Sequence, residues 1–186
     1  SISENYELEK AGHLGGSLEL IQSQTVSGVS QVDFTNIKEG EYKTHFLVVS
    51  ATPSADTQNY IRFSNDGGSS FVSASGSYQY AFRINDEGNT GGNTSSDSST
   101  QLYLNYGGGT GSNEEHSAYY YFHSLGDSTL FSLVTSKAVN AGSTGTTHSF
   151  MSAGVYKTKE VVNGIRLYFQ NGNTTGTYSL YGVKEI

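Results

Sequence analysis

Two carboxylates stand beside an imidazole in Glu114-Glu115-His116, a combination that could perform acid–base catalysis or bind a metal ion. The three residues lie in the glycine-rich stretch Gly107–Ser117, and such a loop does not hold two carboxylates at the fixed separation that glycoside hydrolysis needs. Their order also departs from the His-Glu-x-x-His pattern of helical zinc sites. We therefore interpret the group as part of a solvated loop and expect no catalytic residue in it.

Other residue types that could support catalysis or metal binding are scattered along the chain. The five histidines show no pair at a recurrent metal-ligand spacing: His13, His45, His116, His123 and His148. There is no cysteine and no Gly-x-Ser-x-Gly motif, and Gly107–Gly111 lacks the Lys-Ser/Thr of a phosphate-binding loop. Asp86–Asp97 offers oxygen atoms for calcium, but without the spacing of an EF-hand. The sequence therefore predicts no enzyme activity, no metal site and no cofactor.

The composition is that of one acidic domain that is rich in aromatic residues. A chain of 186 residues is long enough for a sizeable core but short for two domains. The net charge of -7, with only 10 lysines and arginines, disfavours nucleic acid as a partner. No apolar run approaches the ~20 residues of a membrane helix, and Ser1–Lys10 lacks the basic start and apolar stretch of a signal peptide. We expect neither a nucleic-acid nor a membrane partner.

Apolar residues alternate with polar ones far more often than they recur at helical spacing, and this pattern predicts strands. In the segment Tyr42–Val49, Tyr42, Thr44, Phe46 and Val48 form one face, while His45, Leu47 and Val49 lie on the other. The expected strands are Leu18–Val26, Val29–Asn36, Tyr42–Val49, Gln58–Ser64, Ser77–Ile84, Gln101–Tyr106, Ala118–His123, Thr129–Thr135, Ser149–Thr158, Gly164–Gln170 and Thr177–Lys184. About ten strands with frequent turns indicate an all-β fold, an antiparallel β-sandwich or jelly roll.

Glycine and asparagine clusters mark the turns between these strands. Asn65–Gly68 separates Ile61–Phe63 from Phe71–Val72, where residues that tolerate positive φ would close a hairpin. Asn171–Asn173 separates the last two strands in the same way. Both turns are therefore interpreted as hairpin connections.

The longest polar stretches, Asp86–Thr100 and Gly107–Ser117, are expected to be loops at the ends of the sandwich, since strand patterning resumes after each. The segment Ser1–Ser17 precedes the first strand and ends in two glycines and a serine. We interpret it as an N-terminal arm, with a short helix over Ser3–Lys10, and 18–186 as the jelly-roll domain.

The aromatic residues outnumber the places that one small core provides, with 14 tyrosines and 9 phenylalanines. In Tyr119-Tyr120-Tyr121-Phe122, alternation puts Tyr119 and Tyr121 on one face and Tyr120 and Phe122 on the other. Both faces therefore need an apolar or amphipathic neighbour. Three alternatives remain open: packing within the sandwich, an interface with another subunit, and a surface on which carbohydrate stacks.

The segment Ile61-Arg-Phe-Ser-Asn-Asp-Gly-Gly-Ser69 is similar to the R-F-S-x-D-G-G-x hairpin of small jelly-roll virion proteins of tailed bacteriophages. Leu18–Val26, followed by Val32–Thr35, resembles the first strands of that family, and Ile165–Lys184 resembles its final strand pair. These motifs are structural, so the resemblance carries over no catalytic residue. It implies a particle component: a capsid decoration (cement) protein, or a piece of tail fibre or baseplate.

A compact domain with an arm favours a decoration protein that binds the major capsid protein, stabilises the outer shell and forms a homotrimer. It would lie on the capsid surface of the virion after assembly in the host cytoplasm, which the absence of cysteine fits. The expected partner interface is Tyr6, Leu8, His13, Leu14, Tyr119 and Tyr121. The alternative is a tail fibre or baseplate domain that binds host surface glycans through tyrosines near Asp86–Thr100 and Gly107–Ser117.

Overall fold

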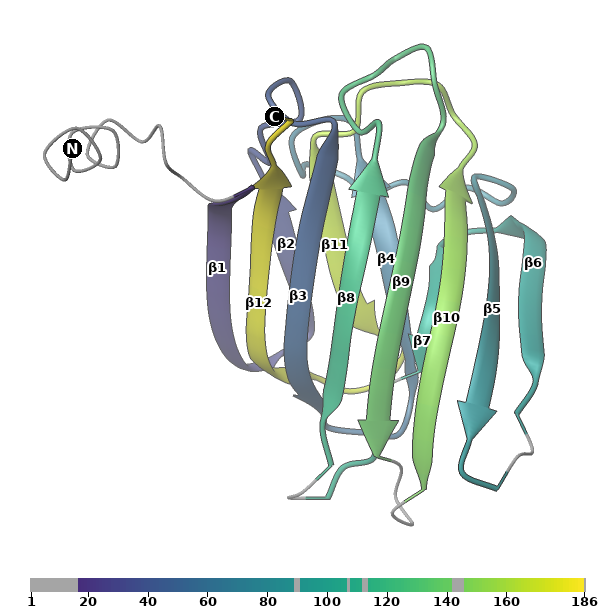
Figure 1. Ribbon diagram of the computed structural model, residues 1–186. Helices are drawn as coiled ribbons and strands as arrows, with labels where there is room; N and C mark the ends of the chain where they lie inside the picture. Colours follow the sequence, from purple (N-terminus) through teal and green to yellow (C-terminus); the bar gives the residue numbers. More distant parts are fainter. Residues whose placement is uncertain (1–16, 89–90, 107, 112–113, 142–145, 186) are drawn as a thin grey trace, which may run out of the picture.

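The computed structural model describes residues 17–88, 91–106, 108–111, 114–141 and 146–185, and the regular structure in these ranges consists of strands (Figure 1). The strands are β1 (Leu18–Val29), β2 (Gln31–Thr35), β3 (Thr44–Pro53), β4 (Gln58–Ser64), β5 (Tyr78–Asp86), β6 (Asn93–Ser99), β7 (Leu102–Tyr106), β8 (His116–His123), β9 (Ser132–Ala141), β10 (Thr147–Tyr156), β11 (Gly164–Phe169) and β12 (Thr174–Val183). The arm and its expected helix over Ser3–Lys10 lie outside the described residues.

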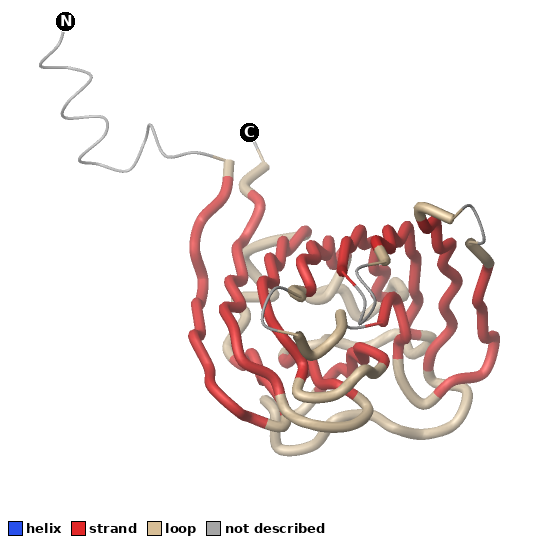
Figure 2. The backbone as a smooth tube through the Cα atoms, turned by 90° about the horizontal axis from the view of Figure 1, so that it is seen from below, coloured by secondary structure: helices blue, strands red, loops and turns tan. Residues whose placement is uncertain are grey.

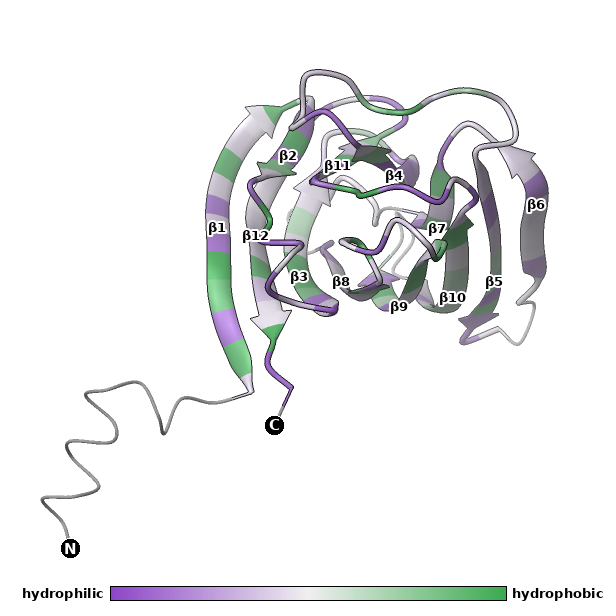
Figure 3. Ribbon diagram, turned by 90° about the horizontal axis from the view of Figure 1, so that it is seen from above, coloured by the Kyte–Doolittle hydropathy of each residue, from purple (hydrophilic) through white to green (hydrophobic). Residues whose placement is uncertain are grey.

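The strands form two antiparallel sheets. The large sheet has the order β1-β12-β3-β8-β9-β10-β5-β6, and the small sheet has the order β2-β11-β4-β7. Seen end-on, the large sheet curves around the small one, so that its inner face is concave and its outer face convex (Figures 2 and 3). The prediction of an antiparallel β-sandwich is confirmed.

The core lies between the sheets, where alternation directs every second side chain. On β3, His45, Leu47 and Val49 are buried while Val48 is exposed, as the pattern predicts. Rings from the two sheets meet directly, since the Phe63 and Phe122 centroids lie 6.0 Å apart in an edge-to-face arrangement. The predicted alternation of β3 thus separates core from surface.

A polar layer crosses this core. The Tyr120 hydroxyl on β8 donates a hydrogen bond to Asn59 Oδ1 on β4 (3.1 Å) and accepts one from Asn105 Nδ2 on β7 (2.9 Å). All three residues are buried. Since a buried amide without a partner is costly, these hydrogen bonds tie the two sheets together in one register.

The expectation that Asp86–Thr100 is entirely a loop is wrong, because Asn93–Ser99 forms β6. This strand pairs with β5 at the edge of the large sheet, with Ala81 opposite Ser95 and Phe82 opposite Thr94. An edge strand can be wholly polar, since its backbone hydrogen bonds to one neighbour suffice and its side chains face solvent. Hydrophobic alternation cannot detect such a strand.

Of the two expected hairpins, the first is formed only in part and the second is not formed. Asn65–Gly68 reverses the chain, with positive φ at Gly67 and Gly68, and the Val72 N–H donates a hydrogen bond to the Phe63 carbonyl oxygen (2.8 Å), but Phe71–Val72 is not a strand. The chain instead continues to β5 in the other sheet. Likewise, Asn171–Asn173 connects β11 in the small sheet to β12 in the large sheet. Turn residues reverse the chain locally, whereas burial of each strand decides which sheet it joins.

Candidate functional site

The outer face of the large sheet exposes apolar side chains on neighbouring strands. They are Phe46 and Val48 on β3, Tyr119 and Tyr121 on β8, Leu133 and Val139 on β9, and Met151 on β10, together termed the large face. Met151 is 56% exposed and Val139 46%. The register aligns Val48, Tyr119, Lys137 and Met151 in one row across four strands. These side chains therefore form one continuous surface.

Aromatic rings stand in contact at the centre of the large face. The Phe46 centroid lies 4.7 Å from that of Tyr121 and 6.0 Å from that of Tyr119. Tyr181 on β12 continues the group at 6.3 Å from Phe46, and His123 stacks beside Tyr121 at 6.4 Å. Contacts between neighbouring rings, together with pairing on both sides of each strand, hold these side chains in place.

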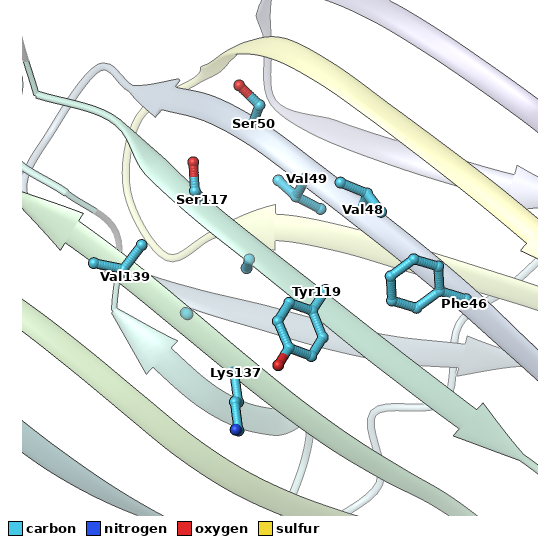
Figure 4. A pocket seen from close by; sticks show the side chains of 10 residues that line it. Phe46, Val48, Val49, Ser50, Ser117, Tyr119, Lys137 and Val139 are labelled. Carbon is cyan, nitrogen blue, oxygen red and sulfur yellow. The ribbon is translucent and has the colours of Figure 1, made fainter.

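A shallow hollow of about 460 Å³ lies on the large face between β3, β8 and β9. Figure 4 shows the Phe46 and Tyr119 rings side by side, with Lys137 and Val139 on the neighbouring strand. The lining is mostly carbon, with the hydroxyls of Ser50 and Ser117 at one end. Such a surface suits an apolar or amphipathic partner that covers several strands.

The structure places the two candidate interface residues of the domain, Tyr119 and Tyr121, together on the large face. The other four candidates, Tyr6, Leu8, His13 and Leu14, lie outside the described residues. Leu133, Val139 and Met151, which are also exposed on the large face, were not among the candidates. Alternation could have shown that Leu133 and Val139 share a face of one strand, but their place beside β8 depends on the register of distant segments.

The expectation that Glu114-Glu115-His116 lies in a solvated loop is wrong for the histidine. His116 begins β8, is fully buried and faces the Phe169 ring at 6.2 Å. Burial lowers the pKa of His116 to about 4, so this side chain is neutral at neutral pH. The strand begins before the predicted Ala118 because His116 and Ser117 pair with β3 and β9.

The two carboxylates serve local hydrogen bonds. Glu114 Oε2 accepts one from the backbone N–H of Gly111 at 2.6 Å. Glu115 Oε1 accepts hydrogen bonds from the hydroxyls of Ser50 (2.5 Å) and Ser117 (3.1 Å). These hydrogen bonds fix both carboxylates to neighbouring backbone and hydroxyl groups.

Two other histidines lie in strands, as predicted. His45 on β3 is buried, and its Nε2 lies 2.8 Å from the Ile37 carbonyl oxygen. His123 Nδ1 lies 3.3 Å from the Thr44 hydroxyl. Among the described residues, no group of three His, Asp or Glu side chains could hold a metal ion. The described part of the chain also contains no helix long and apolar enough to cross a membrane.

The outer face of the small sheet has a different chemistry. It carries Asp33 on β2, Arg166 and Tyr168 on β11, Tyr60 and Arg62 on β4, and Tyr103 on β7, together termed the small face. Arg166 donates two hydrogen bonds of 2.7 Å to the Asp33 carboxylate, which raises the pKa of Arg166. Charged and aromatic groups are therefore fixed side by side on this face.

No protein-family model matches the sequence, and no curated protein matches it either. Among solved structures, the chain is similar to galectin LEC-6 of Caenorhabditis elegans, with 11% identity over 89% of this chain and 96% of that one, at a TM-score of 0.35. It is also similar to the PL-14 alginate lyase from Aplysia kurodai, with 13% identity over 76% of this chain and 68% of that one, at a TM-score of 0.33. Similarities this distant carry no argument about function.

Proposed function

We propose that this chain is a non-enzymatic structural protein of a bacteriophage particle, a decoration protein that docks on the outer shell through the large face. The observation that supports docking is the set of exposed apolar side chains that extends from Val48 to Met151 across four strands, with Lys137 among them. Extended apolar patches on folded proteins mark interaction sites, and aromatic side chains and methionine are enriched at the centre of interfaces. Lys137 is the charged residue of this row.

The large face is also preorganised. Its strands β3, β8, β9 and β10 lie in the middle of the large sheet, each paired on both sides. Docking therefore orders little backbone, and the free energy gained by covering the apolar side chains goes into affinity. A rigid sheet with its contact residues in register suits a protein that stabilises a regular shell. A trimer around a symmetry axis would cover further apolar area.

The assignment to a bacteriophage particle rests on the resemblance of the segment Ile61–Ser69 to phage virion proteins. Hydrogen bonds of this segment explain its serine, aspartate and glycine residues. The Asp66 carboxylate accepts hydrogen bonds from the Ser70 hydroxyl (2.6 Å), the Ser70 N–H (2.9 Å) and the Ser64 hydroxyl (2.7 Å), and these bonds lower the pKa of Asp66 to about 2. Gly67 and Gly68 supply the positive φ of the turn. The motif that resembles phage virion proteins thus stabilises a turn.

The test uses phage particles that lack this chain, prepared from a phage whose gene for it has been deleted. Purified chain is then added to these particles. Quantitative mass spectrometry then counts the copies bound per particle, and on the order of hundreds are expected for a protein that covers a symmetric shell. Val139→Glu places a charge on the large face and should weaken binding about a hundredfold, because that charge must be buried on docking. Val161→Glu, at a valine that is 37% exposed outside the large face, is the matched control and should bind normally.

Three results would contradict the proposal. One is that the purified chain does not associate with particles that lack it. A second is that both glutamate variants bind as the unmodified chain does, which would remove the large face from the interface. The third is a count of only a few copies per particle, which would place the chain in the tail.

A further inference from the structure

Two of the three arginines of the chain stand directly opposite each other on the small face. Arg62 on β4 is the cross-strand partner of Arg166 on β11, and the third arginine, Arg83, lies on β5. Like charges directly opposite each other destabilise a sheet. The repulsion between the two guanidinium groups is relieved where a carboxylate lies beside one of them, and the chain has 17 Asp and Glu residues that could supply it.

Arg166 has that partner, but no ion pair of Arg62 is found within the described ranges. Arg166 forms the bidentate pair with Asp33 and lies over the Phe71 ring at 3.9 Å. The guanidinium of Arg62 donates to the neutral Gln101 Oε1 at 2.7 Å and lies 5.3 Å from the Tyr168 ring centroid. Its Nε–H is buried and has no hydrogen-bond acceptor among the described residues. The positive charge of Arg62 is therefore held in place by a neutral amide and an aromatic ring, without a carboxylate beside it in the described part of the chain.

Tyrosine rings surround this charge. The Tyr60 centroid lies 5.5 Å from that of Tyr168 and 5.6 Å from that of Tyr103. All three rings are partly exposed, and partial burial raises their pKa values. Tyr103 in turn packs against Phe82 of β5 at 4.9 Å, because β5 and β6 extend past the edge strand β7 (Figure 3). The tyrosines thus line a surface bounded on one side by the large sheet.

We propose that the small face binds an acidic saccharide, whose carboxylate pairs with the Arg62 guanidinium while its sugar rings pack on Tyr60, Tyr103 and Tyr168. A sugar ring combines an apolar C–H face with a rim of hydroxyls. The tyrosine rings match the first feature, and the amides of Gln101 and Gln170, which already accept hydrogen bonds from Tyr168 and Tyr60, match the second. A single uncompensated cation fits a carboxylated sugar better than the row of phosphates in a nucleic acid.

Asp33 and Phe71 hold Arg166 by charge-assisted hydrogen bonds and by contact with the ring, so that the charge of Arg166 is already satisfied. Arg62 therefore remains as the group that selects for an anion. The site lies on the opposite side of the sandwich from the large face, so it does not depend on the docking proposed above.

The experiment titrates the full chain with tetragalacturonate, a hyaluronan tetrasaccharide and sialyllactose, and calorimetry or NMR measures the binding. Neutral maltotetraose and acetate serve as control ligands. We expect saturable binding of at least one acidic saccharide, which salt weakens, and binding that is weaker by about tenfold or more for maltotetraose and acetate.

Variants locate the site. Arg62→Gln should weaken binding about tenfold or more, since it removes a charge-assisted hydrogen bond, while Arg83→Gln is the matched control and should bind as the unmodified chain does. Tyr60→Leu keeps apolar bulk but removes the flat ring, and it should weaken binding of the same saccharide even if Arg62→Gln does not fold. The inference is overturned if no acidic saccharide binds, if maltotetraose binds equally well, or if Arg62→Gln and Tyr60→Leu both bind normally.

Discussion

The large face and the small face are the two outer surfaces of one sandwich, yet different interactions hold the side chains of each face in place. On the large face, the rings of Phe46, Tyr119 and Tyr121 pack on one another, and the exposed apolar area is what a partner would cover. On the small face, Arg166 and Asp33 are joined by hydrogen bonds of 2.7 Å, and Arg62 is held by Gln101. The first surface suits broad apolar contact, and the second suits recognition of a particular charged group.

The comparison also separates stability from binding. Side chains of the large face should matter for association and little for folding, because they stay exposed in the isolated chain. Charged side chains of the small face, and the polar layer between the sheets, should matter for folding as well, since each has directional partners already. Three predictions test this distinction, starting with the largest effect.

Tyr120→Phe should give the largest loss of stability. It removes the hydroxyl that joins β8 to Asn59 and Asn105, which leaves buried amide groups without a partner. The expected decrease in the free energy of unfolding is about 2 to 3 kcal/mol. The neighbouring Tyr121→Phe, on the large face, should change it by less than about 0.5 kcal/mol. Urea unfolding of both variants measures the difference, and equal losses would show that the two faces of β8 are not energetically distinct.

Acid should lower the free energy of unfolding by a somewhat smaller amount, through the buried His116. Burial holds the pKa of His116 at about 4, against 6.5 for an ordinary histidine. Below pH 6.5 the unfolded chain binds a proton at this residue that the folded chain does not bind until about pH 4. The free energy of unfolding should therefore fall as the pH is lowered through this window, by about 2 kcal/mol between pH 7 and pH 5 from His116 alone.

His45 acts in the same direction, because burial lowers its pKa as well. The measurement is urea unfolding at several pH values for the unmodified chain and for His116→Leu. The variant should show a flatter pH profile, whatever its stability at neutral pH. Parallel profiles for the two chains would assign the acid sensitivity to other groups.

Asp33→Asn should give a smaller loss, which sets the small face apart from the large one. The change removes the charge that neutralises Arg166 and leaves two arginines facing each other. Because the pair is partly exposed, the expected decrease in the free energy of unfolding is about 1 to 2 kcal/mol, and less at high salt. Lys137→Gln, at the charged residue of the large face, should stay within about 0.5 kcal/mol. A comparable loss in both variants would contradict the distinction between the faces.

The sequence alone determined the strand-rich class and most of the side-chain orientations. Alternation assigned Leu47 and Val49 to one side of β3 and separated Tyr119 and Tyr121 from Tyr120 and Phe122, and each of these assignments agrees with the burial in the structure. Side-chain direction repeats every second residue of a strand, so it can be read from neighbours in the chain. The candidate interface residues Tyr119 and Tyr121 followed from that same periodicity.

Which strands are neighbours could be seen only in the folded molecule. The row from Val48 to Met151, the facing pair Arg62 and Arg166, and the burial of His116 all arise from pairing between segments that lie far apart in the sequence. The polar edge strand β6 carries no apolar signal, and the turn at Asn171–Asn173 could not show that it passes between sheets. Strand orientation is a local property of the backbone, whereas register and sheet membership depend on which distant surfaces bury one another.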